Sequence, residues 1–170
     1  QTGKSSIPDF VGGLSTTFEA YGFDLSIQTA FQLGGYVYDS NYAGLMTTGD
    51  AGQNFHKDMF NRWTPTNTDT NIPALGYQMQ SQTINNGNYV DFFLTDASYF
   101  SLRNITLGYT LPKNWLQKAG IEKLRVYLTG DNIWLQSKRK GLDPRYDFTG
   151  STNFSYSALS TYSIGLNLTL

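Results

Sequence analysis

Five stretches of the chain alternate apolar and polar residues with a period of two, which is the pattern of a β-strand with two different faces. In residues 23–33, for example, one face carries Phe23, Leu25, Ile27, Phe31 and Leu33. The opposite face of the same stretch carries Asp, Ser and Gln side chains. The other four stretches are residues 10–20, 99–111, 124–135 and 161–170. The pattern therefore predicts an all-β chain with five strands.

The lengths of the strands and of their connections favour an antiparallel transmembrane β-barrel. Each stretch has about 10 to 13 residues, which exceeds the ~5 to 6 of soluble strands and matches the ~9 to 11 that cross a bilayer. Short connections at 21–22 and 112–123 alternate with long ones at 34–98 and 136–160. Outer-membrane barrels have short periplasmic turns and longer outer loops. We therefore expect both long connections to be extracellular and the C-terminus to be periplasmic.

The alternation also assigns the two faces of the strands to two environments. A face of Phe, Leu, Ile and Val suits lipid, and a face of Asn, Thr, Ser, Gln, Asp and Arg suits a wet or plugged lumen. Trp134 and Tyr162 stand at the outer ends of their strands, where barrels place aromatic girdles. The side chains expected to face lipid are Phe23, Leu25, Ile27, Phe31, Ile105, Leu107, Val126, Leu128, Trp134, Tyr162, Ile164, Leu166 and Leu168.

Five strands are too few to close a barrel, because small barrels need about eight and an open edge in hydrocarbon leaves backbone groups unpaired. We therefore expect the chain to be the C-terminal part of a larger barrel, in contact with the rest of that barrel and with outer-membrane lipid. The alternative is a soluble all-β carbohydrate-binding or adhesin module, since β-sandwiches also alternate. Residues 34–98 argue against it, because a sandwich places turn signals every ~8 to 12 residues.

Composition and charge narrow the functional classes further. The net charge is −1, so the chain has no basic surface for nucleic acid. Cysteine is absent, which excludes disulfides, thiolate metal sites and cysteine nucleophiles. No pair or triad of residues has the arrangement of a catalytic site, and we expect neither enzymatic activity nor a cofactor.

One group of residues half-matches a calcium-binding loop. Asp39, Asn41 and Asp50 have the spacing of three ligands in such a loop. Ala43 stands where a further ligand is expected, and Asp50 is shorter than the usual bidentate Glu. An ordinary polar turn is therefore the favoured interpretation, with a calcium site as the alternative.

Aromatic and charged side chains in the two long connections are candidates for contact with a substrate or with a protein that covers the barrel. They are Trp63, Tyr36, Tyr38 and Arg145. For Trp63, an aromatic anchor that packs the loop is the favoured interpretation, and contact with a sugar is the alternative. Trp63 ends a short helix expected at about residues 51–63, which also carries the single histidine, His56. With no second His or Cys nearby, His56 is expected to be a solvated loop residue rather than a metal ligand.

Several segments together resemble a known family. They are Arg62–Asn67 (RWTPTN) followed by Ile72-Pro73, Ser98–Pro112 (SYFSLRNITLGYTLP), Leu124–Tyr127 (LRVY) with Asp131-Asn132, Gly141–Pro144 (GLDP) and Tyr162–Leu168 (YSIGLNL). In this order and spacing they are similar to the C-terminal segment of SusC-like (SusC/RagA-type) TonB-dependent transporters of Bacteroidota outer membranes.

The resemblance implies the architecture and partners of that family. It implies a 22-stranded barrel with an N-terminal plug, where the plug and the segment that contacts TonB would lie upstream of this chain. It also implies a SusD-like surface lipoprotein as a lid, and import of oligosaccharides or peptides energised through TonB. The sequence itself does not distinguish between those two kinds of substrate.

Overall fold

The computed structural model describes residues 3–47, 52, 54–74, 91–117, 120–138, 141–146, 152 and 156–170. Contacts between residues divide the chain into two compact units. The first, named here the sheet unit, comprises Ile7–Gly34, Ala97–Asp143 and Tyr156–Leu170. The second, the loop unit, comprises Gln1–Ser6, Gly35–Asp96 and Pro144–Ser155.

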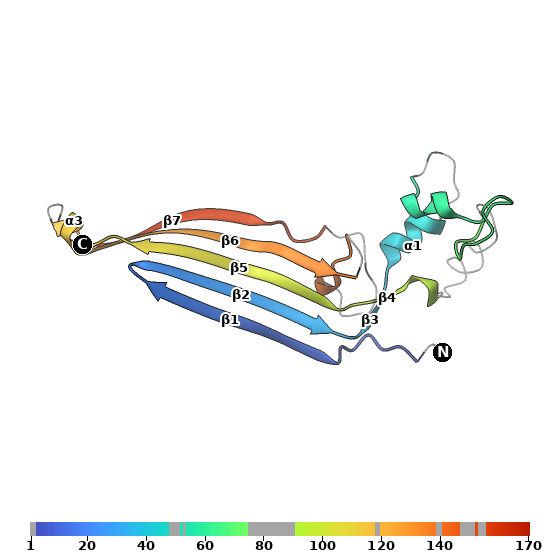
Figure 1. Ribbon diagram of the computed structural model, residues 1–170, viewed down its shortest axis with the longest axis horizontal. Coiled ribbons are helices and arrows are strands. Elements are labelled where there is room, and N and C mark those ends of the chain that lie inside the picture. The colour runs from blue at the N-terminus through green and yellow to red at the C-terminus, as the bar shows by residue number, and fades with distance from the viewer. Residues whose placement is uncertain are drawn as a thin grey trace. The chain divides into compact units, whose positions relative to one another are not determined.

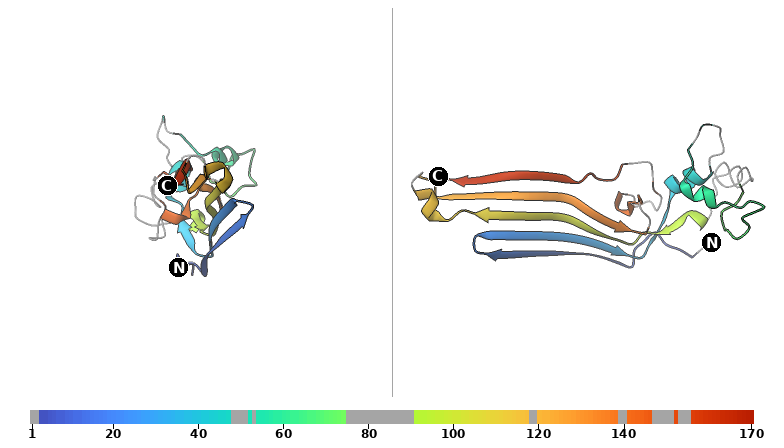
Figure 2. Two further views of the ribbon diagram at one scale, coloured as in Figure 1. Left: turned by 90° about the vertical axis from the view of Figure 1, so that its left-hand side faces the viewer. Right: turned by 45° about the horizontal axis from the view of Figure 1, so that its top comes forward.

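The sheet unit is one antiparallel sheet with the strand order β1-β2-β5-β6-β7 (Figure 1). Figure 2 shows these strands side by side in a single layer. The predicted all-β antiparallel fold is confirmed, and β1 and β2 have the bounds that the alternation predicts. The strands are β1 (Phe10–Ala20), β2 (Phe23–Leu33), β5 (Tyr99–Thr110), β6 (Lys123–Ser137) and β7 (Thr161–Thr169).

The turn between β1 and β2 consists of Tyr21 and Gly22, and both residues have positive φ angles of 53° and 85°. Two successive positive φ angles are typical of the two-residue hairpin turns whose twist matches that of the strands. The carbonyl of Gly22 accepts a hydrogen bond of 2.7 Å from the Thr110 amide. A Cβ at Gly22 would lie 2.9 Å from the Thr110 carbonyl oxygen, so a glycine is needed at this close approach.

The connection from β5 to β6 contains a single turn of helix, α3 (Lys113–Leu116). Pro112 precedes it with extended backbone angles, and the Leu111 amide donates to the Leu124 carbonyl at 2.9 Å. Leu116 is buried, which ties the helix to the end of the sheet. In the part of the chain that the structure describes, no helix is long and apolar enough to cross a bilayer.

The loop unit contains a second, two-stranded sheet and several short helices. Its strands, β3 (Tyr36–Tyr38) and β4 (Leu94–Asp96), pair in antiparallel fashion and thus join the two ends of the long connection. Among its described residues, the helices are α1 (Ser40–Thr47) and the 3-10 segments η1 (Lys57–Asn61), η2 (Asp91–Phe93) and η4 (Pro144–Tyr146).

The loop unit has its own hydrophobic core, which a long surface loop would not need. Phe93 is at the centre of this core and forms edge-to-face contacts with Tyr38 and Tyr42, with ring centroids 6.0 Å apart in both pairs. Ala43, Met46, Met59 and Ile72 complete the buried cluster. The core draws on residues throughout the long connection, so much of it is a small folded structure rather than an extended loop.

The helices of the loop unit differ from the expectation of one short helix at about residues 51–63. Only the five residues of η1 are helical in the described part of that range. His56 caps η1, because its Nδ1 accepts a hydrogen bond of 3.2 Å from the Asp58 amide. The longer helix, α1, lies instead where a polar turn or a calcium loop was expected. The expected helix is therefore wrong in its length, and α1 was not anticipated.

The described residues of the sheet unit form one sheet and no second layer. A β-sandwich would require a second sheet packed on the apolar face, about 10 Å away. The apolar side chains of that face are instead exposed within the unit; Leu166 on β7, for example, is 67% exposed. This arrangement disfavours the soluble sandwich as the alternative fold.

Candidate functional site

The strand register brings the apolar side chains of all five strands to one face of the sheet. Direct partners in an antiparallel pair point to the same side, so each row of partners shares one environment. One complete row consists of Phe18, Leu25, Leu107, Leu128 and Ile164. The next row consists of Ala20, Phe23, Tyr109, Val126 and Leu166. The sheet therefore presents a continuous apolar face from β1 to β7.

A β-bulge in β5 keeps this face continuous toward the far end of the strands. Thr29 pairs with Leu102 although Gln28 pairs with Asn104, so Arg103 is an extra residue on β5. Without the bulge, strict alternation would turn Ser101 rather than Leu102 toward the apolar side. The neighbouring strand β6 shifts register at the same level, where Asn132 has a φ of 55°. The sequence alternation did not reveal this bulge.

Aromatic pairs stand near both ends of the apolar face. Phe23 and Tyr109 contact each other near the short connections, with ring centroids 4.5 Å apart. Phe100 and Trp134 form the corresponding pair near the long connections, at 6.0 Å. Tyr162 is exposed on the same face, since it pairs with Gly130, the partner of Ile105. Aliphatic side chains occupy most of the region between the two aromatic pairs.

The opposite face of the sheet carries hydroxyl and amide groups that bond to one another. Asn104 donates from Nδ2 to Thr129 Oγ1 at 3.0 Å and to Asp131 Oδ1 at 2.7 Å. Thr106 donates from Oγ1 to Asn104 Oδ1 at 3.1 Å and lies 2.9 Å from the Thr129 hydroxyl. This polar network spans β5 and β6 on the same side as Gln28 of β2. In this part of the polar face, neutral hydroxyl and amide groups therefore satisfy one another, and Asp131 is the one charged member of the network.

An ion pair crosses three strands on the polar face near the short connections. Arg125 on β6 donates from Nε to Asp24 Oδ1 on β2 at 2.8 Å, and its Nη2 contacts Asp24 Oδ2. The strand between them contributes Gly108, and a Cβ there would collide with the carboxylate and the guanidinium. Gly108 is thus the gap through which Arg125 reaches Asp24. The sequence did not indicate this pair, because its members are far apart along the chain.

In the loop unit, the RWTPTN segment is a rigid turn that holds two exposed aromatic residues. Asn67 donates from Nδ2 to the carbonyls of Asn61 and Arg62, both at 3.2 Å, and its amide donates to Thr64 at 3.0 Å. The Trp63 amide donates to the carbonyl of Ile72, which is buried in the core of the loop unit. These bonds fix the backbone of the turn to a packed structure.

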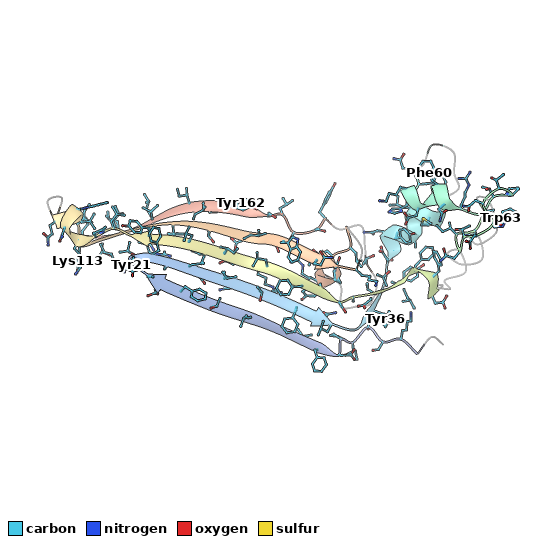
Figure 3. The ribbon with its side chains drawn as sticks, in the orientation of Figure 1. Tyr21, Tyr36, Phe60, Trp63, Lys113 and Tyr162 are labelled. Carbon is cyan, nitrogen blue, oxygen red and sulfur yellow. The ribbon has the colours of Figure 1, made fainter. Side chains whose placement is uncertain are left out.

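The two aromatic side chains on this frame are Phe60 and Trp63 (Figure 3). Phe60 is 90% exposed and Trp63 is 43% exposed within the chain. Large aromatic side chains on a rigid backbone are typical anchors of binding surfaces, because little conformational entropy is lost on binding. Trp63 was a candidate from the sequence; Phe60 was not.

The other residues that the sequence suggests as contacts are more buried than Trp63. Tyr38 is only 7% exposed and packs in the core, so its predicted surface contact is not carried further. Tyr36 is half-buried, with Lys4 Nζ 4.4 Å from its ring centroid. Arg145 is half-buried in η4. The structure does not bring these residues together into one pocket with Trp63 within its described part.

In the half-matched calcium loop, Asp39 has a structural role as a helix cap. Asp39 is fully buried, and its Oδ1 accepts a hydrogen bond of 3.0 Å from the Tyr42 amide, which caps α1. Asn41 follows two residues later on the helix, and Asp50 lies outside the described residues. Within the described part of the chain, no three acidic, His or Cys groups gather as a metal site.

Comparison with known proteins shows which receptors this chain resembles. The chain is 32% identical over 171 residues to the TonB-dependent receptor SusC of Bacteroides thetaiotaomicron, which covers 97% of the chain. It is 29% identical over 172 residues to the TonB-dependent receptor P3 of Formosa agariphila. Over almost its whole length the chain is similar to TonB-dependent receptors, SusC among them. No protein-family model matches it.

Solved structures of a peptide importer contain the same fold. The structure of the RagAB peptide importer in its closed-closed state matches 99% of the chain with a TM-score of 0.83 and 28% identity. The same importer in its open-open state matches 98% of the chain with a TM-score of 0.79. The chain spans only 15–16% of the two curated relatives above and 18% of the matched RagAB chains. The named relatives are TonB-dependent receptors and a peptide importer.

The ion pair of the polar face yields a testable prediction about Gly108. In the complete receptor, Gly108→Ala should displace Arg125 or Asp24 and lower stability by about 1–3 kcal/mol, because the added methyl group has no space. The urea midpoint of unfolding measures this loss. The matched control introduces Gly108→Ala together with Asp24→Ala and Arg125→Ala, where the methyl group has room and should add little further loss. An equal loss in both backgrounds would contradict the proposed role of Gly108.

Proposed function

We propose that this chain forms part of the wall and an outer structure of an outer-membrane active transporter. The complete protein would import oligosaccharides or peptides, with a SusD-like lipoprotein as its lid and TonB as its source of energy. The observation that carries the proposal is the register of the sheet, which collects the apolar side chains of five long strands on one exposed face. We propose no enzymatic activity and no cofactor for this part of the protein.

The apolar face has the extent of a barrel surface that meets lipid. The two aromatic pairs lie near Phe23 and Phe31 along β2, eight residues apart in the register. At ~3.3 Å per residue, this interval is roughly 26 Å along the strand, or roughly 20 Å across a membrane at a tilt of about 40°. Barrels have an apolar band of about 25 Å between two aromatic girdles. The lipid-facing role of the residues predicted from the sequence is therefore part of this proposal.

The polar face and the strand edges support the assignment to a larger barrel. The described sheet pairs β1 only with β2, and β7 only with β6, so each outer strand has one edge that the rest of the same barrel would pair. The polar face would line the lumen, where hydroxyl and amide networks suit either water or a plug. The wall would thus contact the plug of the same protein, which lies in another segment.

The orientation follows from the two kinds of connection. The turn at Tyr21-Gly22 and the α3 connection lie at one end of the strands, and the long connections leave the other end. In outer-membrane barrels the short turns are periplasmic. We propose that the loop unit is extracellular, and that β7 ends on the periplasmic side of the outer membrane.

The loop unit is proposed to contribute to the surface on which the lid rests. Its own core and its pinned RWTPTN turn give a preorganised structure, and Phe60 and Trp63 supply exposed aromatic anchors. Protein interfaces are enriched in such anchors near their centres. Arg145 and Tyr36 remain proposed contacts elsewhere in the loop unit.

A pair of neighbouring residues in β7 tests the assignment of the faces. In the complete receptor, Leu166→Arg should lower the free energy of unfolding in lipid by about 2–4 kcal/mol, because it places a charge in the hydrocarbon layer. Asn167→Arg is the matched control, since Asn167 pairs with Arg125 on the polar face and should tolerate the change. Urea unfolding in lipid vesicles measures both variants. Equal losses would contradict the membrane assignment of the apolar face.

The proposed lid surface is tested by the double variant Phe60→Ala/Trp63→Ala. Removal of two anchor side chains should reduce co-purification of the lipoprotein at least about tenfold, because each anchor contributes on the order of 1–2 kcal/mol. Recovery of the lid on an affinity-tagged receptor measures this. Tyr156→Ala removes an aromatic side chain of the sheet unit that is 96% exposed, and it should leave recovery unchanged. Full recovery with the double variant would show that the lid rests elsewhere.

A further inference from the structure

The β1–β2 turn contains a residue that neither turn geometry nor packing explains. Tyr21 has a φ of 53°, which is unfavourable for a bulky residue, and this turn position is normally taken by Asn, Asp or Gly. Its side chain is also 99% exposed, so no contact within the described chain compensates for the strain. An exposed aromatic in a strained conformation points to a stabilising contact outside the chain.

The neighbouring connection exposes a second aromatic residue on a fixed backbone. Trp115 is 69% exposed, although the next residue in α3, Leu116, is buried. The Trp115 amide donates to the Pro112 carbonyl at 3.1 Å, and the Ile121 amide donates to the Leu116 carbonyl at 3.4 Å. The indole of Trp115 is therefore exposed because of the way the connection is folded, not because the connection is detached from the sheet.

The two aromatic residues belong to the same end of the sheet. The hydrogen bond from Thr110 to Gly22 joins the β1–β2 turn to the strand that leads into α3. Figure 3 shows Tyr21 and Lys113, the first residue of α3, at this end. The apolar face also reaches this end, where Phe23 packs on Tyr109. The exposed aromatic groups thus continue beyond the edge of the apolar face.

The charge of this end complements an anionic surface. Residues 112–123 contain three lysines and one glutamate, and Lys113 is exposed in α3, two residues before Trp115. The Asp24 carboxylate is paired with Arg125, so Glu19 and Glu122 are the carboxylates of this end that offset the three lysines, and one positive charge remains in excess. Trp and Tyr favour the headgroup layer of a membrane because their rings are apolar and their N–H or O–H groups bond to water and headgroups. Lysine is attracted to the phosphates of anionic lipids.

We propose that Tyr21, Trp115 and Lys113 form an anchor that binds anionic phospholipid headgroups at the short-connection end of the sheet. The inference rests on the proposed function, in which the apolar face is embedded in the membrane. The rings of Tyr21 and Trp115 enter the headgroup layer, and the Lys113 ammonium pairs with lipid phosphate. The strain at Tyr21 is then offset by its contact with the membrane interface, which also fixes the vertical position of the barrel wall.

The test compares Tyr21→Asn in two media, because Asn is well suited to this turn but cannot anchor in a headgroup layer. In the complete receptor in neutral maltoside micelles, Tyr21→Asn should raise the melting temperature, since it relieves the strained turn. In nanodiscs that contain phosphatidylglycerol, the same variant should lower it. Phe60→Asn, which removes an exposed aromatic residue from the loop unit, should have the same effect in both media. A shift for Tyr21→Asn of the same sign and size in both media overturns the anchor.

Two further variants test the chemistry of the partner. Exchange of phosphatidylcholine for phosphatidylglycerol in the nanodiscs should stabilise the unmodified receptor, and Lys113→Gln should remove most of that gain. Trp115→Gln should lower the melting temperature in nanodiscs more than in micelles. An undiminished gain with Lys113→Gln overturns the headgroup assignment. Failure of the receptor to insert into nanodiscs would contradict the proposed function itself, whereas insertion without these effects contradicts only the anchor.

Discussion

The constraint on which the structure depends is that five strands keep their apolar side chains on the same face. Because side chains alternate along a strand, a slip of one residue in any pair would move a whole strand's apolar set to the polar side. The register avoids this in all four pairs, and the bulge at Arg103 restores the correct phase where β5 would lose it. Because all five strands alternate in the same register, one face of the sheet is apolar and the other is polar.

The two faces are stabilised by different means. Among the described residues, no second layer of the sheet unit covers the apolar face. Its side chains need an apolar environment, which the interior of a bilayer provides. The polar face satisfies its own groups through the Asn104 network and the Asp24–Arg125 pair, which glycine at 108 permits. A wall of this kind can separate lipid from an aqueous or plugged lumen. The loop unit, in contrast, has a hydrophobic core of its own buried side chains.

The sequence predicted the features that depend on local periodicity and missed those that depend on distant partners. The bounds of β1 and β2 were predictable because alternation continues up to the Tyr21-Gly22 turn. The bulge was not, since Leu102 and Asn104 flank Arg103 without any glycine to mark an irregularity. The Asp24–Arg125 pair was missed because 101 residues separate its members.

The loop unit was the least predictable region for the same reason. Tyr38 was interpreted as a surface residue, yet it is buried because Phe93, from the other end of the long connection, packs against it. Asp39 was interpreted as a turn residue or a calcium ligand, and it caps a helix instead. Packing of the loop was the favoured interpretation of Trp63, with contact as the alternative, and its side chain is 43% exposed. The hydrogen bonds of Asn67 that hold the turn could not be inferred from the motif alone.

The most direct test of the account is a scan of spin-labelled single cysteines along β5 of the complete receptor in lipid bilayers. The ratio of collisions with oxygen, which concentrates in hydrocarbon, to collisions with a water-soluble nickel chelate identifies lipid-facing positions. The account predicts a phase change at Arg103, with high ratios at Phe100, Leu102, Ile105 and Leu107 and low ratios at Ser101, Asn104 and Thr106. Equal ratios at all positions, or an alternation that continues through Arg103 without a phase change, would contradict the account.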